Sequence, residues 1–176
     1  MKKKTNTKKK YQAVVWLLIV AVSMGFGLNI GLSNRNGGPM ADGAAALEEM
    51  ARNNPTNAKA WIRLGNYYFD SDQYEKSIQA YTRALEITPD NANVITDMGV
   101  MYRRAGKPDQ AVAAFDRAIA ADPVHEKSRL NKGIVMLNDL KDIDGAVAAW
   151  EGLLEINPYF MMGNDLSLQE LVNRYK

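Results

Sequence analysis

A spacing of 34 residues recurs along most of this 176-residue chain. Gly65, Gly99 and Gly133 keep this interval, and prolines at positions 55, 89, 123 and 158 follow it until the last step, which is 35. A fixed period of this length is the signature of a repeat protein, in which each unit buries its apolar face only by stacking on its neighbours. The spacing therefore predicts an open stack of short, similar units.

Each unit has the pattern of two amphipathic helices, with apolar residues at i, i+3, i+4 and i+7. Gly65 and Gly99 fall inside the first helix of their units, where glycine costs about 1 kcal/mol relative to alanine. That cost is understandable if the facing helix approaches closely at this point. We expect Tyr81 and Phe115, on the second helices, to fill the space between the two helices of each unit.

These features resemble the tetratricopeptide repeat family, whose units read W-x2-L-G-x2-Y, then A-x3-F, then a closing proline. The first unit carries this pattern as Trp61, Leu64, Gly65, Tyr68, Ser77, Tyr81, Ala84 and Pro89. The second carries it as Ile95, Met98, Gly99, Tyr102, Ala111, Phe115, Ala118 and Pro123. The resemblance implies an all-α superhelix of antiparallel helix pairs over residues 44–176, with repeats at 58–91, 92–125 and 126–160.

The third unit and the two ends depart from the regular pattern. Arg129 and Lys132 stand where apolar residues are expected, Trp150 takes the large aromatic position, and one extra residue is predicted in the turn at 139–144. Residues 44–53 look like the second helix of an incomplete leading unit. Residues 167–175 are expected to form a cap helix that opens on a capping box from Ser167 to Glu170 and covers the end of the stack.

The N-terminal part reads as a membrane anchor. Six of residues 1–10 are lysines. Residues 11–32 contain no charged side chain and are long enough to cross a bilayer. Positive flanks stay on the cytoplasmic side, so this pattern predicts a single-pass protein of a bacterial inner membrane with its repeats on the periplasmic side. A cleaved signal peptide is the alternative for residues 11–32. Gly27 and Gly31 form a G-x-x-x-G pair that would suit a homodimer, and residues 33–43 are predicted to be a flexible linker.

The residue inventory indicates binding rather than catalysis. The chain has no cysteine and one histidine, His125, which is expected in a surface loop between repeats. This set cannot form the usual zinc site, no nucleophile is paired with a base, and no cofactor is expected. Apart from the six N-terminal lysines, 16 basic residues face 20 acidic ones. The expected repeat domain therefore lacks the basic footprint of a nucleic-acid-binding domain.

The first helices of such a stack line its concave side. The resemblance places four positions of each unit in this groove, which we expect to hold a helical or extended segment of another protein. These positions are Lys59, Ile62, Asn66, Phe69, Asn93, Thr96, Val100, Arg103, Lys127, Leu130, Ile134 and Leu137. Packing between repeats is the alternative role for the apolar members.

Three functions suit this organisation. The first is a tethered scaffold that recruits a partner polypeptide through the groove. The second follows from a resemblance of Ala45-Ala46-Leu47-Glu48, Asn54-Pro55 and Ala60-Trp61 to the periplasmic repeat domains of cytochrome c maturation proteins, which implies holding of apocytochrome or of a partner subunit. The third is a structural assembly factor of an envelope complex.

Overall fold

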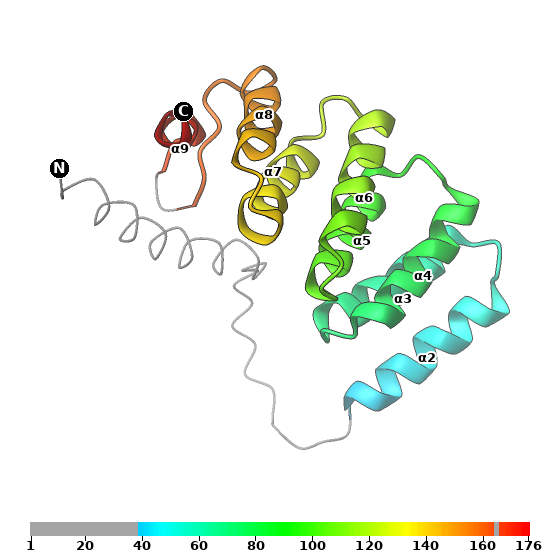
Figure 1. Ribbon diagram of the computed structural model, residues 1–176. Coiled ribbons are helices and arrows are strands. Elements are labelled where there is room, and N and C mark those ends of the chain that lie inside the picture. Colours follow the sequence, from blue (N-terminus) through cyan, green and yellow to red (C-terminus); the bar gives the residue numbers. More distant parts are fainter. Residues whose placement is uncertain (1–38, 164–165) are drawn as a thin grey trace.

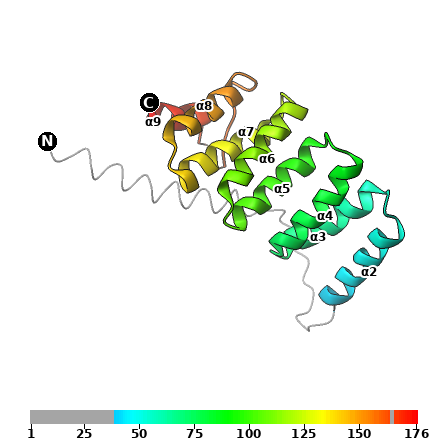
Figure 2. The same cartoon turned by 45° about the vertical axis from the view of Figure 1, so that its right-hand side comes forward.

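The computed structural model describes residues 39–163 and 166–176, and nearly all of them are helical or in short turns (Figure 1). Helix pairs follow one another from α2 to α9 along one curved row, as both views of the ribbon show (Figures 1 and 2). Within the described residues the only β-type pairing is a single bridge between Met161 and Ser167. The elements are α2 (Pro39–Asn53), α3 (Ala58–Asp70), α4 (Tyr74–Ile87), α5 (Ala92–Arg104), α6 (Pro108–Ala121), α7 (Glu126–Val135), the π-helical turn η1 (Met136–Leu140), α8 (Ile143–Leu154) and α9 (Leu168–Tyr175).

The expectation of an all-α stack of helix pairs is confirmed for these residues. Helices α3 and α4 form the first pair, α5 and α6 the second, and α7 and α8 the third. Local signals repeat with the period: Asn57 and Asn91 cap α3 and α5 through their side chains, accepting bonds from Lys59 N and Val94 N. The same residue type thus starts the first helix of both regular repeats.

The close approach expected at the glycines is confirmed. A methyl group built on Gly99 would lie 2.6 Å from the ring of Phe115, which is fully buried. Gly65 meets Tyr81 and Gly133 meets Trp150 in the same way, with even less room for a methyl group. The aromatic ring of each second helix therefore rests directly on the backbone of the first helix.

The third repeat absorbs its extra residue in a π-helical turn. Asp142 N bonds to Met136 O, six residues back, whereas Gln73 N and Lys107 N bond to carbonyls five residues back. The extra residue therefore lies in η1, which begins three residues before the turn predicted at 139–144. A π-turn adds one residue to a helix, and α8 still packs on α7 through Trp150, whose Nε1 donates to Leu130 O at 3.2 Å.

The end helices differ in detail from expectation. Helix α2 begins at Pro39, so residues 39–43 of the predicted linker are helical. Helix α9 covers the end of the stack with Leu168, Leu171 and Val172, all buried beside Trp150. The predicted capping box is wrong in one respect: Ser167 is the N-cap residue, but its side chain makes no capping bond, and the adjacent Leu168 N is committed to Phe160 O at 3.1 Å.

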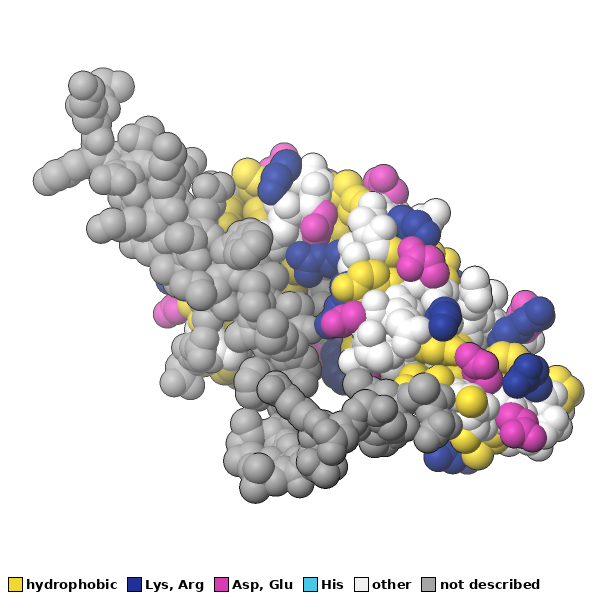
Figure 3. All heavy atoms as spheres, turned by 90° about the horizontal axis from the view of Figure 1, so that it is seen from below, with side chains coloured by type: hydrophobic (Ala, Val, Ile, Leu, Met, Phe, Trp, Pro, Cys, Tyr) yellow, Lys and Arg dark blue, Asp and Glu magenta, His cyan; other side chains and the backbone are white. Residues whose placement is uncertain are grey.

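The predicted basic tail (1–10), membrane segment (11–32) and Gly27/Gly31 pair lie outside the described residues. Among the helices of residues 39–163 and 166–176, none combines the length and the apolar character needed to cross a membrane. On the face drawn in Figure 3, basic and acidic side chains are interspersed with hydrophobic ones over the described helices.

Candidate partner-binding groove

Helices α3, α5 and α7 carry the twelve residues predicted to line the groove, and the structure sorts these residues into three groups. Four polar side chains are exposed: Lys59, Asn66, Asn93 and Lys127. Six are partly buried: Ile62, Phe69, Val100, Arg103, Leu130 and Leu137. Two are buried, Thr96 at 2% exposure and Ile134 at 3%.

Thr96 and Ile134 do not line an open surface. The Thr96 hydroxyl donates to Ala92 O at 2.7 Å and lies 2.7 Å from the Ser128 hydroxyl of the next repeat. Ile134 belongs to the core cluster around Trp150 and Leu153. Both positions are covered because neighbouring side chains close over them, so the groove has ten members in this structure instead of twelve.

The apolar members have a double role. Ile62, Phe69 and Val100 pack against the core shared by the first two repeats, and Leu130 and Leu137 pack against the core of the third repeat and α9. Each of the five keeps part of its surface open to solvent. The groove therefore offers a partner the edges of side chains that are already held in place by packing.

Polar contacts fix the rest of the groove. Asn66 Oδ1 accepts a bond of 2.8 Å from the Tyr81 hydroxyl. Arg103 Nε donates to Asp139 Oδ2 at 2.7 Å, which joins α5 to η1. The Arg104 guanidinium lies 5.0 Å from the centre of the Phe69 ring and bonds Asp72 at 2.8 Å. The bond of Asn66 joins the two helices of one repeat, those of Arg103 and Arg104 link neighbouring repeats, and together they hold the groove side chains in defined positions.

His125 is not the plain surface residue that the sequence predicts. It is partly buried at the N-cap of α7, where Nδ1 lies 2.7 Å from the Ser128 hydroxyl and Nε2 lies 3.2 Å from Asn93 Oδ1. With the buried Thr96, these side chains form a polar bridge between the second and third repeats. The sequence contains a signal for this polar bridge: Thr96 is polar, whereas the equivalent residues of the first and third repeats, Ile62 and Leu130, are apolar.

Asp97 is the residue of this region that the groove assignment missed. Burial is the main cause that raises the pKa of its carboxyl to about 6; Lys127 opposes this shift and the Asp70 carboxylate adds to it. Charges from the first and third repeats thus act on this carboxyl of the second. A negative group here is unsuited to gripping the C-terminal carboxylate of a peptide, since like charges repel.

In the part of the chain that the structure describes, no three His, Asp or Glu side chains come together as metal ligands do. The groove of α3, α5 and α7 is built from packed apolar edges and hydrogen-bonded polar groups. This arrangement is typical of a surface that holds another polypeptide.

Comparison with protein families agrees with this description. Two tetratricopeptide repeat models match residues 56–123 and 96–159, so together they span 56–159. This part of the chain therefore belongs to the tetratricopeptide repeat family.

Curated relatives include quite different proteins. The Escherichia coli O157:H7 protein NrfG, a subunit of the formate-dependent nitrite reductase complex, is 27% identical over 118 residues, which are 64% of this chain and 58% of NrfG. Anaphase-promoting complex subunit 3 of Schizosaccharomyces pombe is 31% identical over 67% of this chain and 18% of its own length. Tmtc3 of Drosophila melanogaster, an O-mannosyl-transferase, is 23% identical over 66% of this chain and 13% of its own length. The chain thus spans less than two thirds of each of these relatives.

Solved structures share the fold. The crystal structure of MamA aligns with a TM-score of 0.63 at 21% identity, covering 69% of this chain and 66% of MamA. The first repeat domain of Spaghetti (RPAP3), bound to the HSP90 peptide SRMEEVD, aligns with a TM-score of 0.59 at 22% identity, covering 69% of this chain and 91% of that domain.

Proposed function

We propose that this protein is a membrane-tethered scaffold whose groove, formed by α3, α5 and α7, holds a segment of a partner polypeptide on the periplasmic side of a bacterial inner membrane. The observation that carries the proposal is the alternation along the groove of fixed, partly exposed apolar side chains with exposed polar ones. The similar RPAP3 domain, which holds a peptide, supports this mode of binding. A scaffold of this kind needs no catalytic group, and we propose no reaction for it.

The charged side chains of the groove indicate which kind of segment it would bind. Lys59 and Lys127 are exposed in the first turns of α3 and α7, whereas Asp97 lies midway along α5 and Asp70 ends α3. A bound segment would therefore pair a basic side chain with the two aspartates and place its apolar side chains against Phe69 and Val100. A chain terminus bound by its carboxylate would face Asp97, so we favour an internal segment of the partner.

The proposed membrane anchor and the proposed periplasmic location of the repeats are argued from the sequence. Residues 11–32 are uncharged and follow six lysines, which supports an anchor with its N-terminus in the cytoplasm. Protease added to spheroplasts should then digest the repeats. Protection of the repeats in intact spheroplasts, with digestion after lysis, would contradict this topology.

A second candidate is a role in cytochrome c maturation, in which the held segment belongs to an apocytochrome or to a partner subunit. The similarity to NrfG over 118 residues favours this candidate. Binding of a synthetic apocytochrome peptide to the groove, measured by fluorescence polarisation, would distinguish this candidate from a scaffold of another pathway.

The groove itself is tested by placing the photocrosslinker benzoylphenylalanine at Asn66, inside the groove, or at Glu49, exposed on α2. We expect Asn66 to give a discrete crosslinked partner that Glu49 does not give. Lys59→Glu with Lys127→Glu should remove this product, because both side chains are exposed in the groove. The matched pair Arg52→Glu with Lys141→Glu makes the same change of charge outside the groove and should leave the product intact. Equal loss in both pairs would refute the groove assignment.

A further inference from the structure

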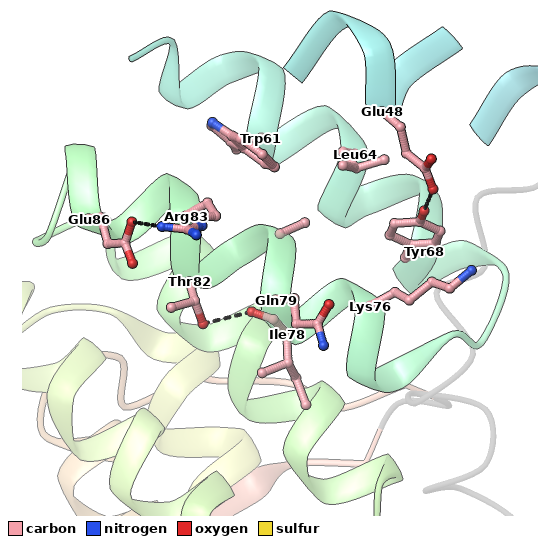
Figure 4. A pocket seen from close by; sticks show the side chains of 11 residues that line it. Glu48, Trp61, Leu64, Tyr68, Lys76, Ile78, Gln79, Thr82, Arg83 and Glu86 are labelled. Atoms are coloured by element: carbon pink, nitrogen blue, oxygen red, sulfur yellow. Dashed lines mark hydrogen bonds and ion pairs between the residues drawn. The ribbon is translucent and has the colours of Figure 1, made fainter. Parts of the chain in front are cut away.

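A second surface of the first repeat is hollowed. A cleft of about 640 Å³ opens between α2, α3 and α4, and we refer to it as the outer cleft (Figure 4). On α3 the outer cleft is lined by Trp61, Leu64 and Tyr68. At 100° per residue around a helix, these side chains are centred roughly 130° away from Ile62, Asn66 and Phe69, so they lie on a different side of α3. The outer cleft is therefore separate from the groove.

The outer cleft has an equivalent in the next repeat, but there it is small. The space between α4, α5 and α6 is lined by residues that include Met98 and Arg117, 34 positions after Leu64 and Arg83, and it measures about 160 Å³. The two regular repeats have the same fold, but different side chains line the two spaces.

One carbonyl group has a different hydrogen-bond donor in the two repeats. In the second repeat, Arg117 Nη2 donates to Pro89 O at 2.6 Å, which draws the arginine onto the end of α4. In the first repeat the equivalent carbonyl, Pro55 O, is taken by the indole of Trp61, whose Nε1 donates to it at 3.0 Å. The second repeat has Ile95 at the Trp61 position, and isoleucine offers no donor. Arg83 pairs instead with Glu86 on its own helix at 2.9 Å.

The charged side chains that line the outer cleft differ in how they are paired. Glu48 accepts a hydrogen bond from the Tyr68 hydroxyl, and Glu86 is paired with Arg83. Lys76 Nζ lies 5.1 Å from the centre of the Tyr68 ring, and within residues 39–163 and 166–176 it makes no ion pair. The Arg83–Glu86 pair is exposed at 62% and 55% and is spaced i, i+3, so it exchanges readily for another anion. In the part of the chain that the structure describes, Lys76 is therefore open to an anionic ligand, and Arg83 can exchange Glu86 for one.

The shape of the outer cleft fits the charges. Trp61 and Arg83 lie towards one end, and Tyr68 and Lys76 lie towards the other (Figure 4). Lys76 and Arg83 are seven residues apart on α4, which is about 10 Å along a helix. An apolar floor of aromatic and aliphatic side chains runs between them. We propose that the outer cleft is a second protein-binding site, which takes a short amphipathic segment whose apolar side chains cover Trp61 and Leu64 and whose carboxylates reach Lys76 and Arg83.

The test uses the full-length chain and two fluorescein-labelled peptides of equal length, the acidic ELLEELLEEL and the basic KLLKKLLKKL, with binding read by fluorescence polarisation. We expect the acidic peptide to bind at least tenfold more tightly than the basic one. Lys76→Gln should weaken binding of the acidic peptide several-fold. The matched control Gln110→Glu makes the same change of one charge at the equivalent position of the next repeat, and it should have little effect.

A third variant tests how the outer cleft is formed. Trp61→Ile installs the residue of the second repeat, so Arg83 is released to bond Pro55 O and the acidic peptide should no longer bind, while circular dichroism shows retained helix. Equal affinity for the two peptides, or equal effects of Lys76→Gln and Gln110→Glu, would overturn the proposal. So would loss of acidic-peptide binding in the groove pair Lys59→Glu with Lys127→Glu, because that result would place the peptide in the groove.

Discussion

Replacing Gly99 by alanine tests the close packing that the glycines permit between the helices of one repeat. In an exposed helix interior this change stabilises a protein by about 1 kcal/mol, because alanine is the better helix former. Here the added methyl group would lie 2.6, 2.9 and 3.0 Å from three atoms of the Phe115 ring. Carbon atoms prefer 3.5–4.0 Å, so the ring or the helix has to move by roughly 1 Å.

The ring has little room for such a move, because Phe115 is fully buried between α5, α6 and the third repeat. Forcing an extra methyl group into a packed core costs about 1–3 kcal/mol, and the tight geometry points to the upper end. Subtracting the gain in helix propensity, we expect Gly99→Ala to lower the free energy of unfolding by about 2 kcal/mol. Urea titration followed by circular dichroism measures this difference.

Two companion variants make the reasoning refutable. A methyl group on Gly43, inside α2, would lie 3.4 Å from Tyr67, an ordinary contact. Gly43→Ala should therefore stabilise the protein, by up to about 1 kcal/mol. Combining Gly99→Ala with Phe115→Leu should cost less than the sum of the two single changes, because the smaller side chain relieves the clash. Stabilisation by Gly99→Ala, of the same size as by Gly43→Ala, would refute the close approach.

Three further outcomes follow from named contacts. Because burial raises the pKa of Asp97 to about 6, the folded protein holds this proton more tightly than the unfolded chain does, so stability should fall as the pH rises from about 4 to about 6 and then stay level. Asp97→Asn should remove this slope and raise stability at about pH 8 by on the order of 1–3 kcal/mol, as urea titrations at several pH values would show. Thr96→Val should cost about 1–3 kcal/mol in the same assay, because it leaves the buried Ser128 hydroxyl without one partner; Asn93→Ala, at the exposed edge of the same polar bridge, should cost less. Tyr68→Phe removes the bond to Glu48 and should speed amide hydrogen exchange in α2 while leaving α7 and α8 unchanged, since each repeat contacts only its neighbours.

Much of the fold was predictable because it is set by short-range, periodic signals. The spacing of Gly65, Gly99 and Gly133 required an aromatic partner one helix later, and Tyr81, Phe115 and Trp150 supply it. Trp150 was assigned correctly even though the third repeat departs from the pattern at Arg129 and Lys132. Those two side chains are accommodated by polar contacts: Arg129 donates to Gly152 O at 3.0 Å, and Lys132 pairs with Asp116 at 2.6 Å.

The details of the candidate site were less predictable, because they depend on which neighbour covers a given position. Ile62, Thr96 and Leu130 are equivalent in the three repeats, yet only Thr96 is fully buried. It is covered because Ser128 and His125 of the next repeat reach back to bond it. The place of a residue within the 34-residue period does not reveal whether a side chain of the following repeat covers that residue.

The outer cleft was also not predictable from the repeat period. The period places Trp61 and Ile95, and likewise Arg83 and Arg117, at equivalent positions, and by itself it predicts equivalent surroundings. An indole bonds the proline carbonyl in the first repeat and a guanidinium bonds it in the second, so equivalent positions have different surroundings in the same fold. Helix α3 therefore presents two chemically different sides, and a single indole donor distinguishes the outer cleft from its equivalent in the next repeat.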